Sequence, residues 1–192
     1  MGLQYLPISW EEYHVTGRKL AATILSYETK YDVIVSISRG GLTLGHMLSD
    51  FLQIPIATIS VQSYTDIQAQ GEVVLASKLQ TPIRGKRVLL VDDVSDTGKT
   101  FRRAKSYLSH LGPKEIATVA IFYKPHSIFR PDFFAKITNK WIIFPYEATE
   151  MPLLITRQMQ QEGKSKREIQ LFLEKLGFTD QQIAFVRKYH VP

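Results

Sequence analysis

The sequence predicts an α/β fold, in which a doubly wound, mainly parallel sheet is flanked by helices and followed by a C-terminal helical extension. Strand-like and helix-like segments alternate along residues 1–150, as expected for parallel strands joined by crossover helices. The strand-like segments are nearly continuous apolar runs, which is typical of strands covered on both faces. Residues 151–192 show helical patterns only. We therefore expect one domain over 1–150 and the extension over 151–192.

The alternation begins with a helix. Ser9 and Glu12 form a capping-box pattern, and apolar or small residues then recur at helical spacing to about Ser26. Polar residues without a clear period fill 62–77, and such long segments are often mobile loops. The other expected elements are strands over 31–37, 54–61, 88–91, 117–123 and 141–144, and helices over 44–51 and 100–111, the latter closed by Gly112-Pro113.

Three short helices are expected in the extension. The first covers 152–162 and stops at Gly163. Ser165 and Glu168 form a second capping box, which opens the next helix. Thr179 or Asp180 can cap the third. This extension is expected to pack on the core or on a neighbouring subunit.

Composition excludes several classes of site. The chain of 192 residues has no cysteine, so disulfides, thiolate zinc sites and cysteine nucleophiles are absent. Neither a signal peptide nor a membrane-spanning run is visible, and a cytoplasmic protein without membrane contact is expected. The net charge of +6 fits a field that attracts polyphosphates, a nucleic-acid surface, or simply a basic surface. No basic block with interleaved aromatics stands out, so a nucleic-acid partner is not expected.

Residues 88–100 carry the strongest chemical pattern in the chain. Four β-formers end in Asp92 and Asp93, and a short loop, Asp96–Thr100, follows. Neighbouring carboxylates at the end of a buried strand need a partner such as a sugar diol or a metal. Gly98 permits a tight turn whose amides, with those of the next helix, can hold a phosphate. The alternatives are an ordinary connection and simple capping of the next helix.

These thirteen residues resemble the signature of type I phosphoribosyltransferases, which use phosphoribosyl pyrophosphate (PRPP). The resemblance implies that Asp92 and Asp93 bind the ribose hydroxyls directly or through Mg²⁺, the expected cofactor. It further implies that Asp96 is the general base near the purine N7, for which a structural N-cap role is the alternative. The implied 5′-phosphate ligands are Asp96, Thr97, Gly98, Lys99 and Thr100.

A second loop, Ser38-Arg39-Gly40-Gly41, follows the strand over 31–37. Two glycines allow backbone amides to approach an anion, and Arg39 adds a fixed positive charge; an ordinary strand-to-helix turn is the alternative. The loop is similar to the pyrophosphate loop of the same family, which implies a cis peptide between Ser38 and Arg39 and a catalytic role for Arg39 at the leaving group. By the same resemblance, Ser63 and Tyr64 bind PRPP at the start of a lid that closes over the reacting centre.

A lysine and a tryptophan indicate the acceptor. Lys124 ends the strand over 117–123, and Trp141 opens the last strand; a solvated lysine and a core tryptophan are the alternatives. The pair resembles the purine site of xanthine–guanine and hypoxanthine–guanine phosphoribosyltransferases. The resemblance implies that Lys124 donates to the 6-oxo group, Trp141 stacks on the base and the main chain of Ile142 reads the 2-position. Ile143 departs from the acidic residue that the bacterial enzymes have.

The resemblance therefore implies an enzyme of purine salvage. It would convert PRPP and a 6-oxopurine (guanine, xanthine or hypoxanthine) to the nucleoside 5′-monophosphate and pyrophosphate, as a homo-oligomer, either a dimer or a tetramer. One alternative is a PRPP-sensing transcriptional regulator with the same fold, but such a regulator would not need Lys124 and Trp141. Another is an enzyme that uses a pyrimidine or adenine, which Lys124 disfavours because an ammonium group only donates hydrogen bonds.

Overall fold

The computed structural model describes residues 4–63 and 73–191. The chain divides into two compact units, one formed by His14–Asn139 and the other by the segments before and after it. The division predicted at residue 150 separates an expected enzyme domain from an extension, and it stays a prediction. No helix in the described part of the chain is both long and apolar enough to cross a membrane.

The first unit is built on a seven-stranded sheet with the order β4-β3-β2-β5-β7-β6, in which β8 also pairs with β7. All neighbouring pairs are parallel except β3 with β4, which confirms the predicted α/β class. The strands are β2 (Val33–Ser38), β3 (Ile56–Ser63), β4 (Val73–Ser77), β5 (Arg87–Val91), β6 (Val94–Ser95), β7 (Glu115–Tyr123) and β8 (Phe133–Ile137).

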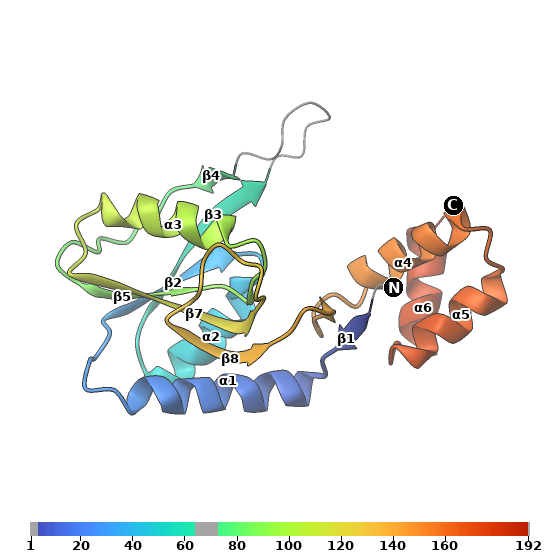
Figure 1. Ribbon diagram of the computed structural model, residues 1–192, viewed down its shortest axis with the longest axis horizontal. Coiled ribbons are helices and arrows are strands. Elements are labelled where there is room, and N and C mark those ends of the chain that lie inside the picture. Colours follow the sequence, from blue (N-terminus) through green and yellow to red (C-terminus); the bar gives the residue numbers. More distant parts are fainter. Residues whose placement is uncertain (1–3, 64–72, 192) are drawn as a thin grey trace. The chain divides into compact units, whose positions relative to one another are not determined.

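Helices lie on both faces of this sheet (Figure 1). They are α1 (Trp10–Leu25), α2 (Gly41–Leu52) and α3 (Lys99–Ser109), and α3 lies on the opposite face from α1 and α2. Alternate residues of the strands meet the apolar stripe of α3, because strand side chains alternate between faces. The resulting core includes Val33, Val35, Ile37, Val88, Leu90, Phe101, Ala104 and Leu108.

The parallel strands β2, β5 and β7 are direct neighbours, so their carboxyl ends meet at one edge of the sheet. Three connections leave from this edge: residues 39–40 into α2, residues 92–98 towards α3, and residues 124–132 between β7 and β8. Ligands of open α/β sheets bind beyond this edge. Every predicted site residue of the first unit except Ser63 and Tyr64 belongs to these connections or to the residues that flank them.

The second unit contains a two-stranded parallel sheet and three helices. β1 (Tyr5–Pro7) pairs with β9 (Trp141–Ile143), and the helices are α4 (Glu150–Gln161), α5 (Lys166–Lys175) and α6 (Asp180–Tyr189). Both predicted caps are confirmed, since Ser165 and Thr179 form full capping boxes with Glu168 and Gln182. Ile143 of β9 shares one apolar core with Phe178 of the turn between α5 and α6 and with the helices, which contribute Met151, Ile155, Ile169, Leu173 and Ile183.

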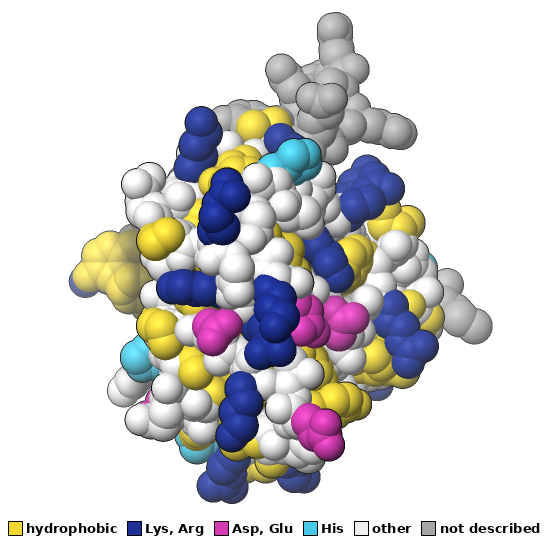
Figure 2. Space-filling view, turned by 90° about the vertical axis from the view of Figure 1, so that its left-hand side faces the viewer, with side chains coloured by type: hydrophobic (Ala, Val, Ile, Leu, Met, Phe, Trp, Pro, Cys, Tyr) yellow, Lys and Arg dark blue, Asp and Glu magenta, His cyan; other side chains and the backbone are white. Residues whose placement is uncertain are grey.

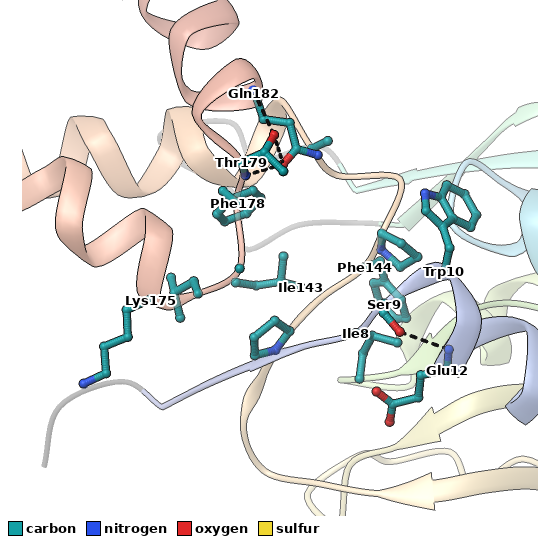
Figure 3. Close-up of a pocket in the computed structure, with 15 residues that line it drawn as sticks. Ile8, Ser9, Trp10, Glu12, Ile143, Phe144, Lys175, Phe178, Thr179 and Gln182 are labelled. Carbon is teal, nitrogen blue, oxygen red and sulfur yellow. Dashed lines mark hydrogen bonds between the residues drawn. The ribbon is translucent and has the colours of Figure 1, made fainter.

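A pocket of about 550 Å³ opens in the second unit (Figure 3). Its wall comes from the residues that join β1 to α1, the residues after β9, and the turn between α5 and α6. Thr179 and Gln182 bond to each other here, with the Thr179 hydroxyl 3.2 Å from the Gln182 oxygen. The lining is mainly apolar, with Ile143, Phe144 and Phe178 among its side chains.

Four strands, β1, β4, β6 and β8, are not predicted by the sequence patterns. β1 and β6 have only three and two residues, and β4 and β8, although as long as β5, lie at the edges of the sheet with few buried side chains among those described. The prediction of an irregular segment over 62–77 is wrong at both ends, because residues 62–63 belong to β3 and residues 73–77 form β4; residues 64–72 lie outside the described part. The strand predicted over 141–144 is present as β9 but pairs with β1 and not with the large sheet, because a strand pattern does not specify its partner.

Candidate active site

The acid pair lies directly after β5. Asp92 is buried, and its carboxylate accepts hydrogen bonds from the amides of Asp93, at 3.0 Å, and of Gly41. Burial raises the pKa of Asp92 well above its ordinary value, and the neighbouring charge of Asp93 raises it further; the two amide donors act in the opposite direction. The pair therefore holds unfavourable negative charge that a ligand can stabilise.

The glycines of the second loop pack against these acids. A Cβ atom on Gly40 would collide with the carboxylate of Asp93, and one on Gly41 would collide with the carbonyl oxygen of Val91. Only glycine allows the two connections to approach this closely. The structure thus brings the predicted pyrophosphate loop and the acid pair together, as the sequence analysis expected.

Ser38 and Arg39 precede these glycines at the end of β2. The peptide bond between them is cis, which confirms the position implied by the family resemblance. Ser38 is half-buried and Arg39 is exposed, so the guanidinium group is accessible to an anion from solvent.

The predicted phosphate loop, Asp96–Thr100, leads from β6 into the first turn of α3. Gly98 occupies the N-cap position of α3 with φ 80°, a backbone conformation that glycine adopts readily. The carboxylates of Asp92, Asp93 and Asp96 therefore do not cap this helix. The first turn of any helix leaves amides without intrahelical acceptors, and here they adjoin a cavity of about 210 Å³ lined by residues 92–98, Thr100 and Phe101.

Lys124 lies against this loop. Its side chain is only 10% exposed, and Nζ is 3.3 Å from Oδ1 of Asp96. A buried ammonium group needs such a partner, and the alternative of a solvated lysine is wrong. The structure therefore brings together the side chains predicted to read the 6-oxo group and to accept the proton.

His126 makes a contact with Asp96 that the sequence patterns do not predict. Its Nε2 is 3.0 Å from the same Oδ1 atom of Asp96. The sequence does contain a signal, because Lys124-Pro125-His126-Ser127 follows a strand and has proline at the second position of a turn. The amide of Ser127 indeed donates to the carbonyl of Lys124, at 2.9 Å.

Three main-chain and side-chain hydrogen bonds fasten this turn to the phosphate loop. The amide of Lys124 donates to the carbonyl of Ser95 at 3.1 Å, and the amide of Ile128 donates to the carbonyl of Thr97 at 3.1 Å. The hydroxyl of Ser95 donates to the carbonyl of Phe129 at 2.6 Å. The predicted phosphate loop and the turn that carries Lys124 and His126 are therefore held side by side.

Trp141 and Ile142 belong to β9 of the second unit. The indole of Trp141 is 41% exposed, so this residue is not part of a core, and the side chain of Ile142 is buried. The amide of Trp141 donates to the carbonyl of Gln4 at 2.8 Å. The participation of both residues in a purine site stays a prediction. Of the two lid residues, Ser63 ends β3 and Tyr64 lies outside the described residues.

The acid pair fits a divalent cation by its chemistry. Two adjacent carboxylates that disfavour each other's ionisation would both be stabilised by a positive ion between them and the substrate. No group of three or more His, Cys, Asp or Glu side chains comes together in the part of the chain that the structure describes. A bound Mg²⁺ would therefore use oxygens of substrate and water as further ligands, which is common for this ion.

Comparisons with known proteins agree with this geometry. A family model described as phosphoribosyl transferase domain matches residues 9–152. The chain is 32% identical over 143 residues to a xanthine-guanine phosphoribosyltransferase of Idiomarina loihiensis, covering 73% of this chain and 85% of the relative. A crystal structure of a purine phosphoribosyltransferase from Pyrococcus horikoshii superposes with a TM-score of 0.68 at 34% identity, covering 74% of this chain and 93% of the other.

A third similarity concerns the fold alone. A hypothetical protein from Neisseria gonorrhoeae, whose crystal structure contains ppGpp, superposes with a TM-score of 0.66 at 23% identity. The match covers 85% of this chain and 99% of the other. It therefore covers a larger share of this chain than the match to the Pyrococcus structure.

Proposed function

The chain belongs to the phosphoribosyltransferase family, and from this membership we propose that it transfers the 5-phosphoribosyl group of PRPP to a 6-oxopurine. The products would be the nucleoside 5′-monophosphate and pyrophosphate. The observation that carries the proposal is the ion pair of Lys124 with Asp96, 3.3 Å long, beside the phosphate loop. It supports the proposal because a cation that could donate to the base and a carboxylate that could accept a proton lie side by side.

The PRPP part of the proposal rests on the sheet edge. Residues 96–100 would hold the 5′-phosphate through loop and helix amides and through hydroxyl groups. Asp92 and Asp93 would bind the ribose hydroxyls, and the loop Ser38–Gly41 would bind the pyrophosphate. The net charge of +6 favours the approach of such an anion. The face in Figure 2, at the end of the sheet opposite to this edge, also carries basic side chains with fewer acidic ones between them.

Mg²⁺ is the proposed cofactor, held by Asp92 and Asp93 partly through ribose or water. When bound, it would supply positive charge near the ribose and the departing pyrophosphate. The protein's own contribution there is the guanidinium group of Arg39 with the loop amides, which would stabilise negative charge on the leaving group.

Lys124 would select the base. Its ammonium group can only donate hydrogen bonds, so it suits the 6-oxo group of guanine, xanthine or hypoxanthine and opposes the 6-amino group of adenine. The flat indole of Trp141 would cover the flat base, and the main chain of Ile142 would contact the 2-position. The names of the Idiomarina and Pyrococcus relatives support a purine acceptor.

The transfer step needs only PRPP, the purine and the side chains of this site. A new bond forms between the purine N9 and C1′ of the ribose, while the bond from C1′ to the pyrophosphate oxygen breaks and its electron pair leaves with pyrophosphate. The proton on the purine N7 passes to the carboxylate of Asp96. A positioned general base typically contributes about 10²–10⁴-fold to a rate.

The test is a steady-state assay with PRPP and Mg²⁺, in which hypoxanthine, guanine, xanthine and adenine are compared side by side. We expect pyrophosphate release that depends on at least one 6-oxopurine and is far slower with adenine. Pyrophosphate release that requires adenine or a pyrimidine, or no release with any base, would overturn the proposal.

A cytoplasmic dimer or tetramer is the proposed assembly, and light scattering measures its mass.

A further inference from the structure

The carboxylate of Asp96 receives two side-chain donors on one oxygen. Nζ of Lys124 is 3.3 Å from Oδ1, and Nε2 of His126 is 3.0 Å from the same atom. Within the described residues, no hydrogen bond to Oδ2 is formed. One oxygen is therefore fixed by the protein, and the other is available to a ligand.

We propose that His126 is the positioning residue for the general base: its Nε2–H group holds Oδ1 of Asp96 and so directs Oδ2 towards the purine proton. This inference rests on the proposed function, because it concerns a base that acts on a bound purine. His126 would act through Asp96 and would not touch the substrate.

Substrate binding makes this second donor necessary. In the free protein Lys124 pairs with Asp96, but in the proposed complex Lys124 also donates to the 6-oxo group of the base. The ammonium group of Lys124 then interacts with two acceptors, so its interaction with Asp96 is weaker. His126 has no such second task in the described structure, and its contact persists while Lys124 turns to the base. A base that keeps its orientation during the reaction retains its full catalytic contribution.

The turn that carries His126 is built to keep the imidazole in place. Pro125 occupies the second position of the turn, where its fixed φ is favourable, and His126 occupies the third. The residues on both sides of His126 are bonded to the phosphate loop or to each other, through Lys124 to Ser95 and Ser127 to Lys124. The ring is 57% exposed, so it contributes little to the core and can be replaced without loss of the fold.

The test replaces the donor and then restores it. His126→Leu removes the hydrogen bond at similar side-chain size, whereas His126→Gln returns an N–H group close to the position of Nε2. Because product release limits kcat in many enzymes, the rate of nucleotide formation is measured in single turnovers by rapid quench. We expect His126→Leu to slow this step about tenfold, as for the loss of one hydrogen bond to a charged group, and His126→Gln to restore most of it. The Kd for PRPP should stay the same in both.

A double-mutant cycle separates positioning from a general structural effect. In an Asp96→Asn protein, His126→Leu should cause no further loss, because the residue acts only through the carboxylate. Equal losses in both backgrounds, or a single-turnover rate of His126→Leu equal to that of the parent, would overturn the inference. If the parent itself transfers phosphoribosyl to no purine, the proposed function fails instead, so the two failures are distinguishable.

Discussion

At the scale of single residues, the burial of Asp92 makes the stability of the protein depend on pH. Its carboxyl group is buried beside Asp93, and its pKa is raised by burial first and by the neighbouring charge second. A raised pKa means that the folded protein keeps this proton to a higher pH than the unfolded chain does. The free energy of unfolding is therefore largest below the ordinary pKa of aspartate and falls as the pH rises through the raised value.

We predict that Asp92→Asn stabilises the free protein at pH 8 and changes little at pH 4, because the amide removes the buried charge. Each unit of pKa difference corresponds to about 1.4 kcal/mol. Thermal melts across pH, without PRPP or Mg²⁺, measure the effect, and the exposed Asp50→Asn serves as the control. The same variant should lose the stabilisation that PRPP with Mg²⁺ gives the parent. A variant that melts no higher than the parent at pH 8 would contradict this account of Asp92.

The residue scale also shows what a single sequence predicts well. Asp92, Asp93, Asp96 and Lys124 stand out by residue type and by their place after strands, their roles are implied only by the family resemblance, and the structure brings them to one edge. His126 was not identified, because a histidine in a turn has no sequence pattern that specifies its partner. Its contact with Asp96 depends on how two connections from different strands are fastened to each other.

At the scale of elements, the phosphate loop depends on its packing against the turn after β7. Gly98 has φ 80°, and a Cβ atom there would lie 2.5 Å from the amide nitrogen of Phe129. Gly85 has a similar φ of 73° but nothing within 4 Å of such an atom. At both positions the positive φ would strain any other residue. Only at Gly98 would a side chain also collide with neighbouring atoms.

We predict that Gly98→Ala destabilises the protein by more than Gly85→Ala and weakens PRPP binding at least tenfold. Backbone strain alone costs roughly 1–2 kcal/mol for alanine in this conformation, so Gly85→Ala should lose about that much and keep its PRPP affinity. Urea unfolding and calorimetric titration with PRPP measure the two quantities. Equal effects of the two substitutions on PRPP affinity would show that the loop does not depend on this packing.

Element patterns explain where the fold could be predicted and where it could not. Mostly buried apolar strands such as β2 and β5 and well-capped helices such as α5 and α6 lie at nearly their predicted positions. β4 and β8 are as long as β5 but lie at the edges of the sheet with few buried side chains among those described, so no buried apolar run marks them. The pairing of β9 with β1 depends on contacts between the two ends of the chain, which a local pattern does not contain.

At the scale of the whole molecule, the C-terminal helices share a core with the strand that carries Trp141. Ile143 of β9 belongs to the same apolar cluster as Leu173 of α5 and Ile183 of α6. The extension predicted over 151–192 therefore shares its core with a strand of the domain predicted over 1–150, and the division between the two stays a prediction. Since Trp141 and Ile142 lie on β9, the helices support the strand that would contact the purine.

We predict that Leu173→Ala costs about 2–5 kcal/mol of stability, the usual range for a fully buried leucine. Leu173 is 1% exposed, whereas its neighbour Leu171 is 56% exposed, and Leu171→Ala should change stability by no more than about 0.5 kcal/mol. In steady-state assays Leu173→Ala should raise the KM for the purine more than the KM for PRPP. A similar rise of the KM for the purine and the KM for PRPP would show that the helices do not specifically support the proposed base site.

The central claim is that Lys124, paired with Asp96, makes this phosphoribosyltransferase a 6-oxopurine enzyme. The most direct test is the ratio of kcat/KM for hypoxanthine to kcat/KM for adenine, measured in the parent and in Lys124→Met. We predict a ratio of about 10² or more in the parent and a fall of at least tenfold in Lys124→Met, with the KM for PRPP nearly unchanged. The loss corresponds to one charge-assisted hydrogen bond to the substrate. An unchanged ratio, or an equal loss towards both bases, would contradict the claim.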